Sequence, residues 1–374
     1  MHKKIFATSF QIFLVIGFLY LFLLSIGLMG LAFNSFGKEF AENLIKTTSN
    51  PLIGLFIGLM ATSIVQSSST TTSIVVGMVG YNVITVHNAI PIIMGANIGT
   101  TITCMLVSLG HITRREEFKR AITGSTVHDF FNIICVCILF PLQITTGFLE
   151  KIATRMSIIF SNFGGIKFTS PLKIITKPAI NFIKEGLANL NIGQNLTYIL
   201  LLIISLILLF LSLYFIVRLM KSLVIERVEI ILNNIIGRHG ILGIIASLIF
   251  TAIIQSSSVT TSLMVPLVAS GILTVETIYP IIMGANIGTT VTAILAAFAT
   301  GNMAAITVAF VHFLFNVIGV LFIYPIKSIR RIPIMLATIM GNLAYKKRRY
   351  ILLYTLFVFF IIPGLLIFIA ELFK

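Results

Sequence analysis

Long apolar stretches, separated by short charged segments, run along most of this 374-residue chain. A helix needs about 20 predominantly apolar residues to cross a bilayer. The chain is 57% hydrophobic and only 10% charged, whereas a soluble domain carries roughly 25% charged residues. The pattern therefore predicts an all-α membrane protein, with complete spans at residues 10–33, 121–147, 196–217, 303–324 and 351–370.

Other apolar stretches are interrupted by polar residues, and these interruptions occur twice. The tetrapeptide Gln66–Ser69 is repeated at Gln255–Ser258. The eleven-residue block that begins at Pro91 is repeated unchanged from Pro280. Both motifs recur at the same offset of 189 residues (255 − 66 and 280 − 91), so the chain contains a duplicated unit.

The segments around these motifs predict two unusual elements in each copy. In the first copy the tetrapeptide joins apolar arms at 51–65 and 73–86, each too short to span a bilayer. Short arms around a polar break favour a re-entrant helical hairpin. Gly, Asn and Thr at 95–101 interrupt a stretch that is otherwise long enough to span, which is typical of a broken transmembrane helix. The second copy predicts the same two elements at 240–273 and 276–299.

The distribution of Lys and Arg predicts the orientation of the chain. The densest basic clusters lie at 111–120, 218–239 and 327–349, and Lys3 and Lys4 precede the first span. The positive-inside rule places these clusters and the N-terminus on the cytoplasmic side. Counting spans from there makes the two hairpins enter the membrane from opposite faces. Inverted repeats with broken helices that meet at mid-membrane are typical of secondary transporters.

The connecting segments carry most of the charge, and the layout divides the chain into five segments. The net charge of +15 comes from connecting segments, which indicates contact with anionic headgroups rather than with nucleic acid. The connector between the repeats contains one amphipathic piece at 150–160. The predicted segments are the first transmembrane helix with an external segment (1–50), repeat 1 with its hairpin, broken helix and Asp-bearing helix (51–147), a connector with one transmembrane helix (148–239), repeat 2 (240–326), and a basic cytoplasmic segment with the last transmembrane helix (327–374).

Both polar clusters are almost free of charged residues. Residues 51–110 contain no Lys, Arg, Asp or Glu, and residues 240–310 contain only Glu276. Hydroxyl and carbonyl oxygens suit Na⁺, and free N–H groups at helix N-termini suit an anion. An anion held without a fixed cation needs co-bound cations, so the sequence predicts a cation-coupled anion transporter. The anion donors would be Ser67, Ser68, Ser69, Ser256, Ser257 and Ser258.

Asp129 is the one acidic residue well inside a predicted span, where an ionised side chain costs roughly 2.5–3.5 kcal/mol on insertion scales. Its simplest role is as a ligand for Na⁺, and the alternative is an ion pair with an Arg in a loop. Its counterpart in the second repeat is Phe313, aligned through His128 and His312, so the repeats are unequal. Both histidines are expected to be hydrogen-bonded core residues rather than proton sites.

Two other interpretations of the serine clusters are weaker. Ser, Thr and Gly often serve only close helix packing in membranes, but two neutral clusters with matching helix breaks disfavour that interpretation. A nucleophilic serine enzyme is disfavoured because no carboxylate or His lies near either cluster in sequence. Cys104, Cys135 and Cys137 lack the spacing of a metal or redox site and are expected to be small buried hydrophobes.

The doubled motif and the segment Thr126–Asn132 resemble the type II sodium-dependent phosphate cotransporters, over about residues 50–150 and 240–360. The chain lacks the long cysteine-bearing external loop and the long cytoplasmic tail of animal relatives, which suggests a bacterial member. The resemblance implies a symporter that imports inorganic phosphate, mainly the dianion, with several Na⁺ ions by alternating access. Electrogenic members have an Asp at the position of Asp129, so electrogenic transport is expected.

The resemblance also implies a set of site residues and partners. Phosphate would bind between the two hairpins, at the six serines named above. The expected partners are phosphate, Na⁺ and the lipid bilayer of the cell (inner) membrane, and a homodimer is compatible with the sequence. No cofactor, transition metal, enzymatic activity or nucleic acid is expected. The sodium ligands would be Gln66, Asn97, Thr100, Asp129, Gln255, Ser256, Asn286, Thr289 and Thr292.

Two alternatives to phosphate symport stay open at this level. A Na⁺-coupled carrier of another oxyanion, such as sulfate or arsenate, would use similar neutral donors. A channel or a non-transporting membrane scaffold belongs to a different class. Broken helices and inverted repeats favour a carrier over that class.

Overall fold

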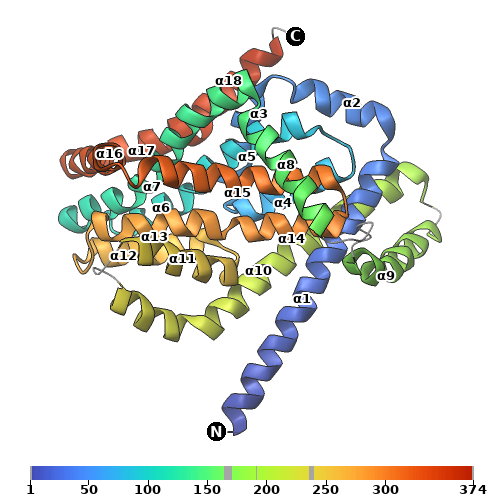
Figure 1. Ribbon diagram of the computed structural model, residues 1–374, viewed down its shortest axis with the longest axis horizontal. Helices are drawn as coiled ribbons and strands as arrows, with labels where there is room; N and C mark the ends of the chain where they lie inside the picture. The colour runs from blue at the N-terminus through green and yellow to red at the C-terminus, as the bar shows by residue number, and fades with distance from the viewer. Residues whose placement is uncertain (1, 164–170, 191, 236–239, 373–374) are drawn as a thin grey trace.

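The computed structural model describes residues 2–163, 171–190, 192–235 and 240–372. Helices make up almost all of this part of the chain, and it contains no strand (Figure 1). Seven of its helices are long and apolar enough to cross a membrane, or up to eight if a pair bent by 99° counts as one span. The all-α prediction is therefore confirmed, and the chain is a multi-pass membrane protein.

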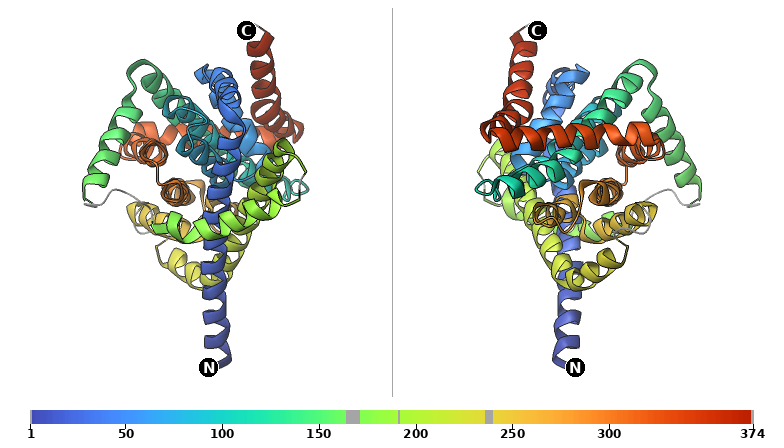
Figure 2. Two further views of the ribbon diagram at one scale, coloured as in Figure 1. Left: turned by 90° about the vertical axis from the view of Figure 1, so that its right-hand side faces the viewer. Right: turned by 90° about the vertical axis from the view of Figure 1, so that its left-hand side faces the viewer.

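The long apolar helices lie where the sequence predicts spans. Helix α10 is the main difference, because it continues well beyond the predicted end at residue 217. The N- and C-terminal helices project from opposite ends of the molecule (Figure 2). The spans are formed by α1 (His2–Ser35), α5 with α6 (Val86–Gly99, Ile102–Leu109), α7 (Arg115–Thr146), α10 (Gln194–Ile235), α13 with α14 (Val275–Gly288, Thr290–Thr300), α15 (Met303–Ile323), and α17 with η1 and α18 (Arg349–Leu356, Phe357–Ile361, Ile362–Leu372).

Two helical hairpins carry the repeated tetrapeptides. The first consists of α3 (Pro51–Val65) and α4 (Ser68–Gly80), and the second of α11 (Gly240–Ile254) and α12 (Ser257–Ala269). In each, the first arm ends at a glutamine with a left-handed backbone, with φ 56° at position 66 and φ 61° at position 255. The next serine caps the second arm, because its hydroxyl accepts a backbone N–H three residues later, over 3.2 Å and 3.4 Å. The tetrapeptide thus contains both the end of one helix and the start of the next.

The second arm of the first hairpin begins earlier than the sequence suggested. It starts at Ser68 and ends at Gly80, whereas the predicted arm covered 73–86. The hydroxyls of Thr71 and Thr72 donate to backbone carbonyl oxygens four residues earlier, over 3.2 Å and 2.8 Å. A polar run that satisfies its hydroxyls along its own helix can stay helical in apolar surroundings, so composition alone placed the break too widely.

The breaks in the long helices are also shorter than predicted. Helix α5 continues through the predicted break at 95–101 as far as Gly99, and α13 reaches Gly288. The repeated glycines instead allow close packing, since a Cβ at Gly95 would overlap the carbonyl oxygen of Leu55 on α3. Gly284 faces the carbonyl oxygen of Ile244 on α11 in the same way. Small residues of this kind let membrane helices approach at backbone distance.

The two repeats have the same order of elements and pack across one another. Helix α3 packs on α5 and α11 on α13 within each repeat, while α4 packs on α14 and α6 on α12 between repeats. One apolar core contains residues from both, such as Leu59, Val127, Phe250 and Phe315. The opposite membrane orientation of the repeats stays a prediction.

Four helices lie in segments where no span was predicted. They follow an amphipathic pattern, and α8 includes the amphipathic piece expected at 150–160. Helix α16, expected as a basic loop segment, packs along α7 and buries Pro333, Ala337, Gly341 and Ala344. Cys137 is exposed, contrary to the expectation that all three cysteines are buried. The additional helices are α2 (Gly37–Thr47), α8 (Phe148–Phe163), α9 (Pro171–Ala188) and α16 (Lys327–Lys346).

Candidate functional site

A cavity of ≈ 440 Å³ lies between the tips of the two hairpins and one side of α10. Both repeats contribute polar side chains to it. The hairpin residues that line it are Val65, Gln66, Ser67, Ser69, Thr70, Gln255 and Ser256. Helix α10 contributes Phe210, Leu213, Tyr214, Val217, Arg218 and Lys221.

Ser69 connects the two hairpin tips directly. Its hydroxyl donates to the backbone carbonyl oxygen of Gln255 over 3.0 Å and lies 3.3 Å from the hydroxyl of Thr289. Thr289 lies at the break between α13 and α14. A residue predicted to bind phosphate therefore contacts two residues predicted to bind sodium, across 186 and 220 residues of sequence.

Only three of the six predicted serines line the cavity. Ser67, Ser69 and Ser256 do so, while Ser68 and Ser257 are buried in the first turns of α4 and α12. Ser258 is half-buried and does not line the cavity, and among the described residues it makes no hydrogen bond to Gln66 that would match the one from Ser69 to Gln255. Successive side chains of a helix with 3.6 residues per turn point in different directions, so three adjacent serines cannot all face one cavity.

Several oxygens of the second tip and of the helices that follow the breaks are buried without a hydrogen-bond partner. They include Oε1 of Gln255 and the hydroxyl oxygen of Thr292, both predicted sodium ligands. Leaving such an atom unsatisfied costs about 1–3 kcal/mol, so these oxygens are suited to coordinate a cation. The hydroxyl oxygen of Thr103 is also buried without a hydrogen-bond partner. Thr103 was missed, although the 189-residue offset relates it to Thr292 (292 − 103).

The two repeated asparagines belong to a buried amide network rather than to the cavity. Asn286 Nδ2 donates to Asn132 Oδ1 over 2.7 Å, and Asn132 Nδ2 donates to the carbonyl oxygen of Asn97 over 2.7 Å. Asn316 Nδ2 donates to Asn97 Oδ1 over 3.2 Å, and His128 Nε2 lies 2.7 Å from Asn286 Oδ1. The network joins both repeats through α5, α7, α13 and α15, which gives Asn97 and Asn286 a structural role here.

The remaining predicted residues lie outside the cavity. Thr100 donates its hydroxyl to the carbonyl oxygen of Ala96 over 2.9 Å. His312 is buried, but neither ring nitrogen has a hydrogen-bond partner, contrary to the expectation of a hydrogen-bonded core histidine.

Asp129 is buried on α7 and is not among the residues that line the cavity. Its Oδ2 accepts a long hydrogen bond of 3.4 Å from the hydroxyl of Tyr354 on α17, and Thr101, which follows the end of α5, also interacts with the carboxylate. None of the ion pairs in the described part of the chain involves Asp129, so the alternative pairing with a loop arginine is wrong there. A buried carboxylate that has no ion-pair partner in the described structure is consistent with a cation ligand.

Two basic side chains line the cavity, whereas the sequence predicted an anion site without a fixed Lys or Arg. Arg218 and Lys221 are exposed side chains on α10 that line the cavity mouth. They lie far in sequence from either motif and were assigned to a charged segment after the span. The lining residues Phe210, Tyr214, Val217 and Lys221 recur at helical spacing, and this continuation of the helix is the signal that could have revealed them.

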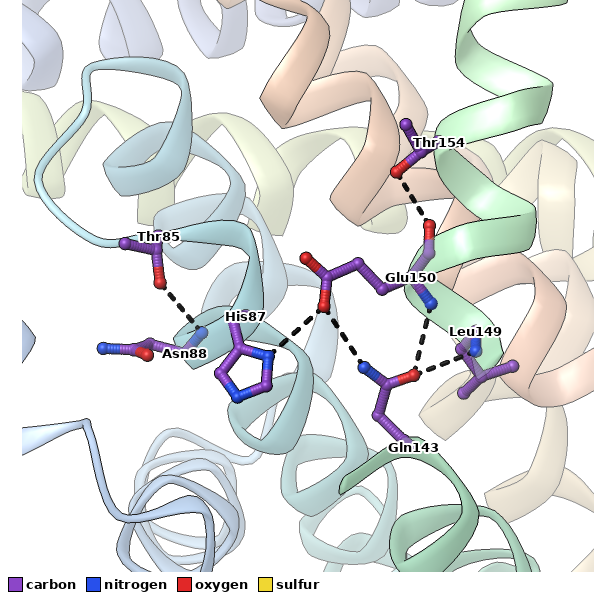
Figure 3. A network of polar contacts seen from close by, with 7 residues as sticks. All are labelled: Thr85, His87, Asn88, Gln143, Leu149, Glu150 and Thr154. Carbon is purple, nitrogen blue, oxygen red and sulfur yellow. Dashed lines mark hydrogen bonds and ion pairs between the residues drawn. The ribbon is translucent and has the colours of Figure 1, made fainter. Parts of the chain in front are cut away.

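A second polar network fixes the N-terminal end of α5 (Figure 3). His87 Nδ1 lies 3.3 Å from Glu150 Oε2, and Gln143 Nε2 donates to the same oxygen over 3.4 Å. Gln143 Oε1 accepts the backbone N–H groups of Leu149 over 2.9 Å and of Glu150 over 3.2 Å. The broken helix is thereby attached to the turn between α7 and α8.

Comparison with known proteins gives a consistent result over both repeats. The family model described as Na+/Pi-cotransporter matches residues 21–170 and 208–347. Sodium-dependent phosphate transport protein 2B of Homo sapiens is 35% identical over 94% of this chain and 64% of its own length, and the 2B protein of Pongo abelii gives the same values. The 2A protein of Ovis aries is 33% identical over 96% of this chain and 67% of its own length. The chain thus spans about two thirds of the length of these relatives, and no solved structure matches it.

Proposed function

The chain belongs to the Na+/Pi-cotransporter family, and from this premise we propose that it transports inorganic phosphate together with Na⁺. Its relatives are named as sodium-dependent phosphate transport proteins. The single observation that best supports the proposal is the cavity shared by the two hairpin tips, with serine hydroxyls from both repeats. Transport is inward, across the cell membrane, with the N-terminus on the cytoplasmic side.

Phosphate binds in the cavity through neutral donors and two cations. The hydroxyls of Ser67, Ser69 and Ser256 are available from the two tips. Helices α4 and α12 begin at these tips, and their N-terminal N–H groups and dipoles favour a negative charge there. Arg218 and Lys221 attract the anion toward the mouth and add charge-assisted hydrogen bonds.

Sodium is coupled to phosphate through the contact that Ser69 makes. Na⁺ binds at the unsatisfied oxygens of Gln255 and Thr292 together with Thr289, and a related site includes Thr103. The Ser69 hydroxyl lines the phosphate cavity and at the same time holds Gln255 and Thr289 in place beside the proposed Na⁺ site, so either ligand stabilises the arrangement that the other needs. Each ligand thereby raises the affinity of the other, as a coupling free energy between two sites requires.

Alternating access and electrogenic transport are part of the same proposal. The repeats exchange contacts across the shared core, and Asp129 supplies the one fixed negative charge that has no equivalent at Phe313. With this carboxylate occupied by Na⁺, net positive charge moves with each phosphate dianion. Simultaneous measurement of current and labelled phosphate uptake tests this step, and zero charge per phosphate contradicts it.

The decisive experiment is uptake of labelled phosphate into proteoliposomes with and without an imposed Na⁺ gradient. We expect accumulation only with the Na⁺ gradient, and unlabelled sulfate should compete poorly. Phosphate uptake that is equal with and without the Na⁺ gradient would overturn the proposal, and so would the absence of uptake by protein shown to be folded. Stronger inhibition by sulfate or arsenate than by phosphate would identify another oxyanion as the substrate.

A further inference from the structure

A second cavity lies where α16 ends and α17 begins. It measures ≈ 420 Å³ and shares no residue with the cavity at the hairpin tips. No acidic residue is among those that line it. The lining consists of Tyr345 and five basic residues, Arg115, Lys346, Lys347, Arg348 and Arg349.

The charges of this basic cavity are not neutralised within the described chain. The three ion pairs found there join Glu150 or Glu117 to His87, His111 and Arg114, so none of the five cations takes part. Four of the five are consecutive in sequence, and like charges held together repel one another. An external anion would relieve this repulsion.

The arrangement of the cavity is partly fixed by contacts with its surroundings. The Arg348 guanidinium donates to the carbonyl oxygen of Thr113 over 3.0 Å, which holds the α16–α17 junction against the turn before α7. The Arg349 guanidinium lies 5.8 Å from the centre of the Tyr350 ring. Cations from two distant segments are therefore brought to one concave surface.

The position of the cavity points to a lipid. Arg349 is the first residue of an apolar span, 349–370, with mean hydropathy 2.7 and only 17% of its window buried. Leu352, Leu353 and Leu356 in its first turns are exposed. The basic cavity thus lies at the end of the least buried spanning helix, where phospholipid headgroups meet acyl chains.

We propose that this basic cavity binds the phosphate-bearing headgroup of an anionic phospholipid, whose acyl chains lie along the exposed leucines of α17. Arg and Lys donate charge-assisted hydrogen bonds to phosphodiester oxygens. A zwitterionic headgroup carries the same phosphate, but its ammonium group would face the five cations. Free inorganic phosphate has no acyl chains to cover the apolar surface beside the cavity. The site is independent of the transport function.

The test measures lipid binding to the purified full chain. Delipidated protein in detergent is titrated with phosphatidylglycerol or phosphatidylcholine, and bound lipids are counted by native mass spectrometry. The test variant is Lys346→Gln/Lys347→Gln/Arg349→Gln, which leaves Arg348 and its contact with Thr113 in place. Each basic residue near an anionic surface contributes about fivefold, so the affinity for phosphatidylglycerol should fall about 100-fold.

Two controls separate the site from general charge and from misfolding. Lys151→Gln/Arg155→Gln/Lys177→Gln removes three exposed cations from α8 and α9 and should bind phosphatidylglycerol as the parent does. Lys346→Arg/Lys347→Arg keeps the charge and should also bind normally. Equal loss in both triple variants, or equal binding of the two lipids by the parent, would overturn the proposal. Displacement of phosphatidylglycerol by an equal concentration of inorganic phosphate would identify a free-anion site instead and overturn it too.

Discussion

Replacing Ser69 with alanine tests whether the contact between the hairpin tips couples Na⁺ to phosphate. The side chain is buried, and its hydroxyl is the group that reaches both the Gln255 carbonyl and Thr289. Ser69→Ala removes one hydrogen bond to a carbonyl oxygen and one hydroxyl contact without adding volume. The two oxygens on the second repeat then lose their partner from the first.

The size of the effect follows from these contacts. A hydrogen bond contributes about 1 kcal/mol net, and a buried acceptor left unpaired costs about 1–3 kcal/mol. Without this contact Gln255 and Thr289 relax toward other partners, and restoring the arrangement that binds Na⁺ costs part of that free energy. A free energy of about 1.4 kcal/mol corresponds to a factor of ten. The Na⁺ concentration that gives half-maximal uptake, called the Na⁺ constant below, should therefore rise about 5- to 30-fold. It would be measured as the Na⁺ dependence of labelled phosphate uptake at saturating phosphate.

The repeat supplies a matched control for this experiment. Ser258 occupies the same motif position 189 residues later (258 − 69), but it does not bridge the tips in the described structure. Ser258→Ala should change the Na⁺ constant by about twofold or less, as for a substitution away from such a contact. Equal effects of the two variants, or a Ser69→Ala effect confined to the phosphate KM, would refute the coupling argument. Thermal unfolding in detergent would show that both variants are folded.

Three further variants address other parts of the site. Tyr354→Phe removes the 3.4 Å hydrogen bond to Asp129, and because that bond is long we expect only about a two- to fivefold rise in the Na⁺ constant; an unchanged Na⁺ curve would contradict this. Asn286→Ala removes two buried hydrogen bonds of 2.7 Å and should destabilise the protein by about 2–4 kcal/mol, seen as a lower unfolding temperature; an unchanged temperature would show that the network is not structural. Arg218→Gln/Lys221→Gln should raise the phosphate KM about tenfold at low ionic strength and less at high salt; a KM equal to that of the parent would exclude the two cations from the anion path.

The sequence predicts the features of this site that lie within a repeat. Each hairpin tip lies where a glutamine ends one helix and the next serine caps the following helix. The pair occurs as Gln66 with Ser67 and again as Gln255 with Ser256. The extent of the helices does not follow as well, because Thr71 and Thr72 look like a polar break although they satisfy their hydroxyls within α4. Local composition cannot distinguish a polar residue that breaks a helix from one that is bonded along it.

Features that depend on contacts between repeats, or with α10, could not be predicted in this way. Which serines face the cavity depends on how α4 is rotated when it packs on α14, and α12 when it packs on α6. Arg218 and Lys221 reach the site from α10, which belongs to neither repeat, so the duplicated motif could not predict them. The amide network likewise engages Asn97 and Asn286 through tertiary packing, although their identical surroundings in sequence suggested a shared ligand role.

Corresponding motifs of the two repeats make different contacts, and the differences fit the proposed carrier with two states. Ser69 bridges the tips while Ser258 does not, and His128 is bonded to Asn286 while His312 has no bond to Asn97. The tetrapeptides have the same sequence, so the difference between Ser69 and Ser258 comes from their surroundings, with α10 lying on one side of the tips. If the repeats are inverted, as the basic segments predict, exchanging these contacts between repeats gives a conformation of similar energy that opens the opposite face. A second state in which the Ser69 hydroxyl still donates to the Gln255 carbonyl would contradict this exchange.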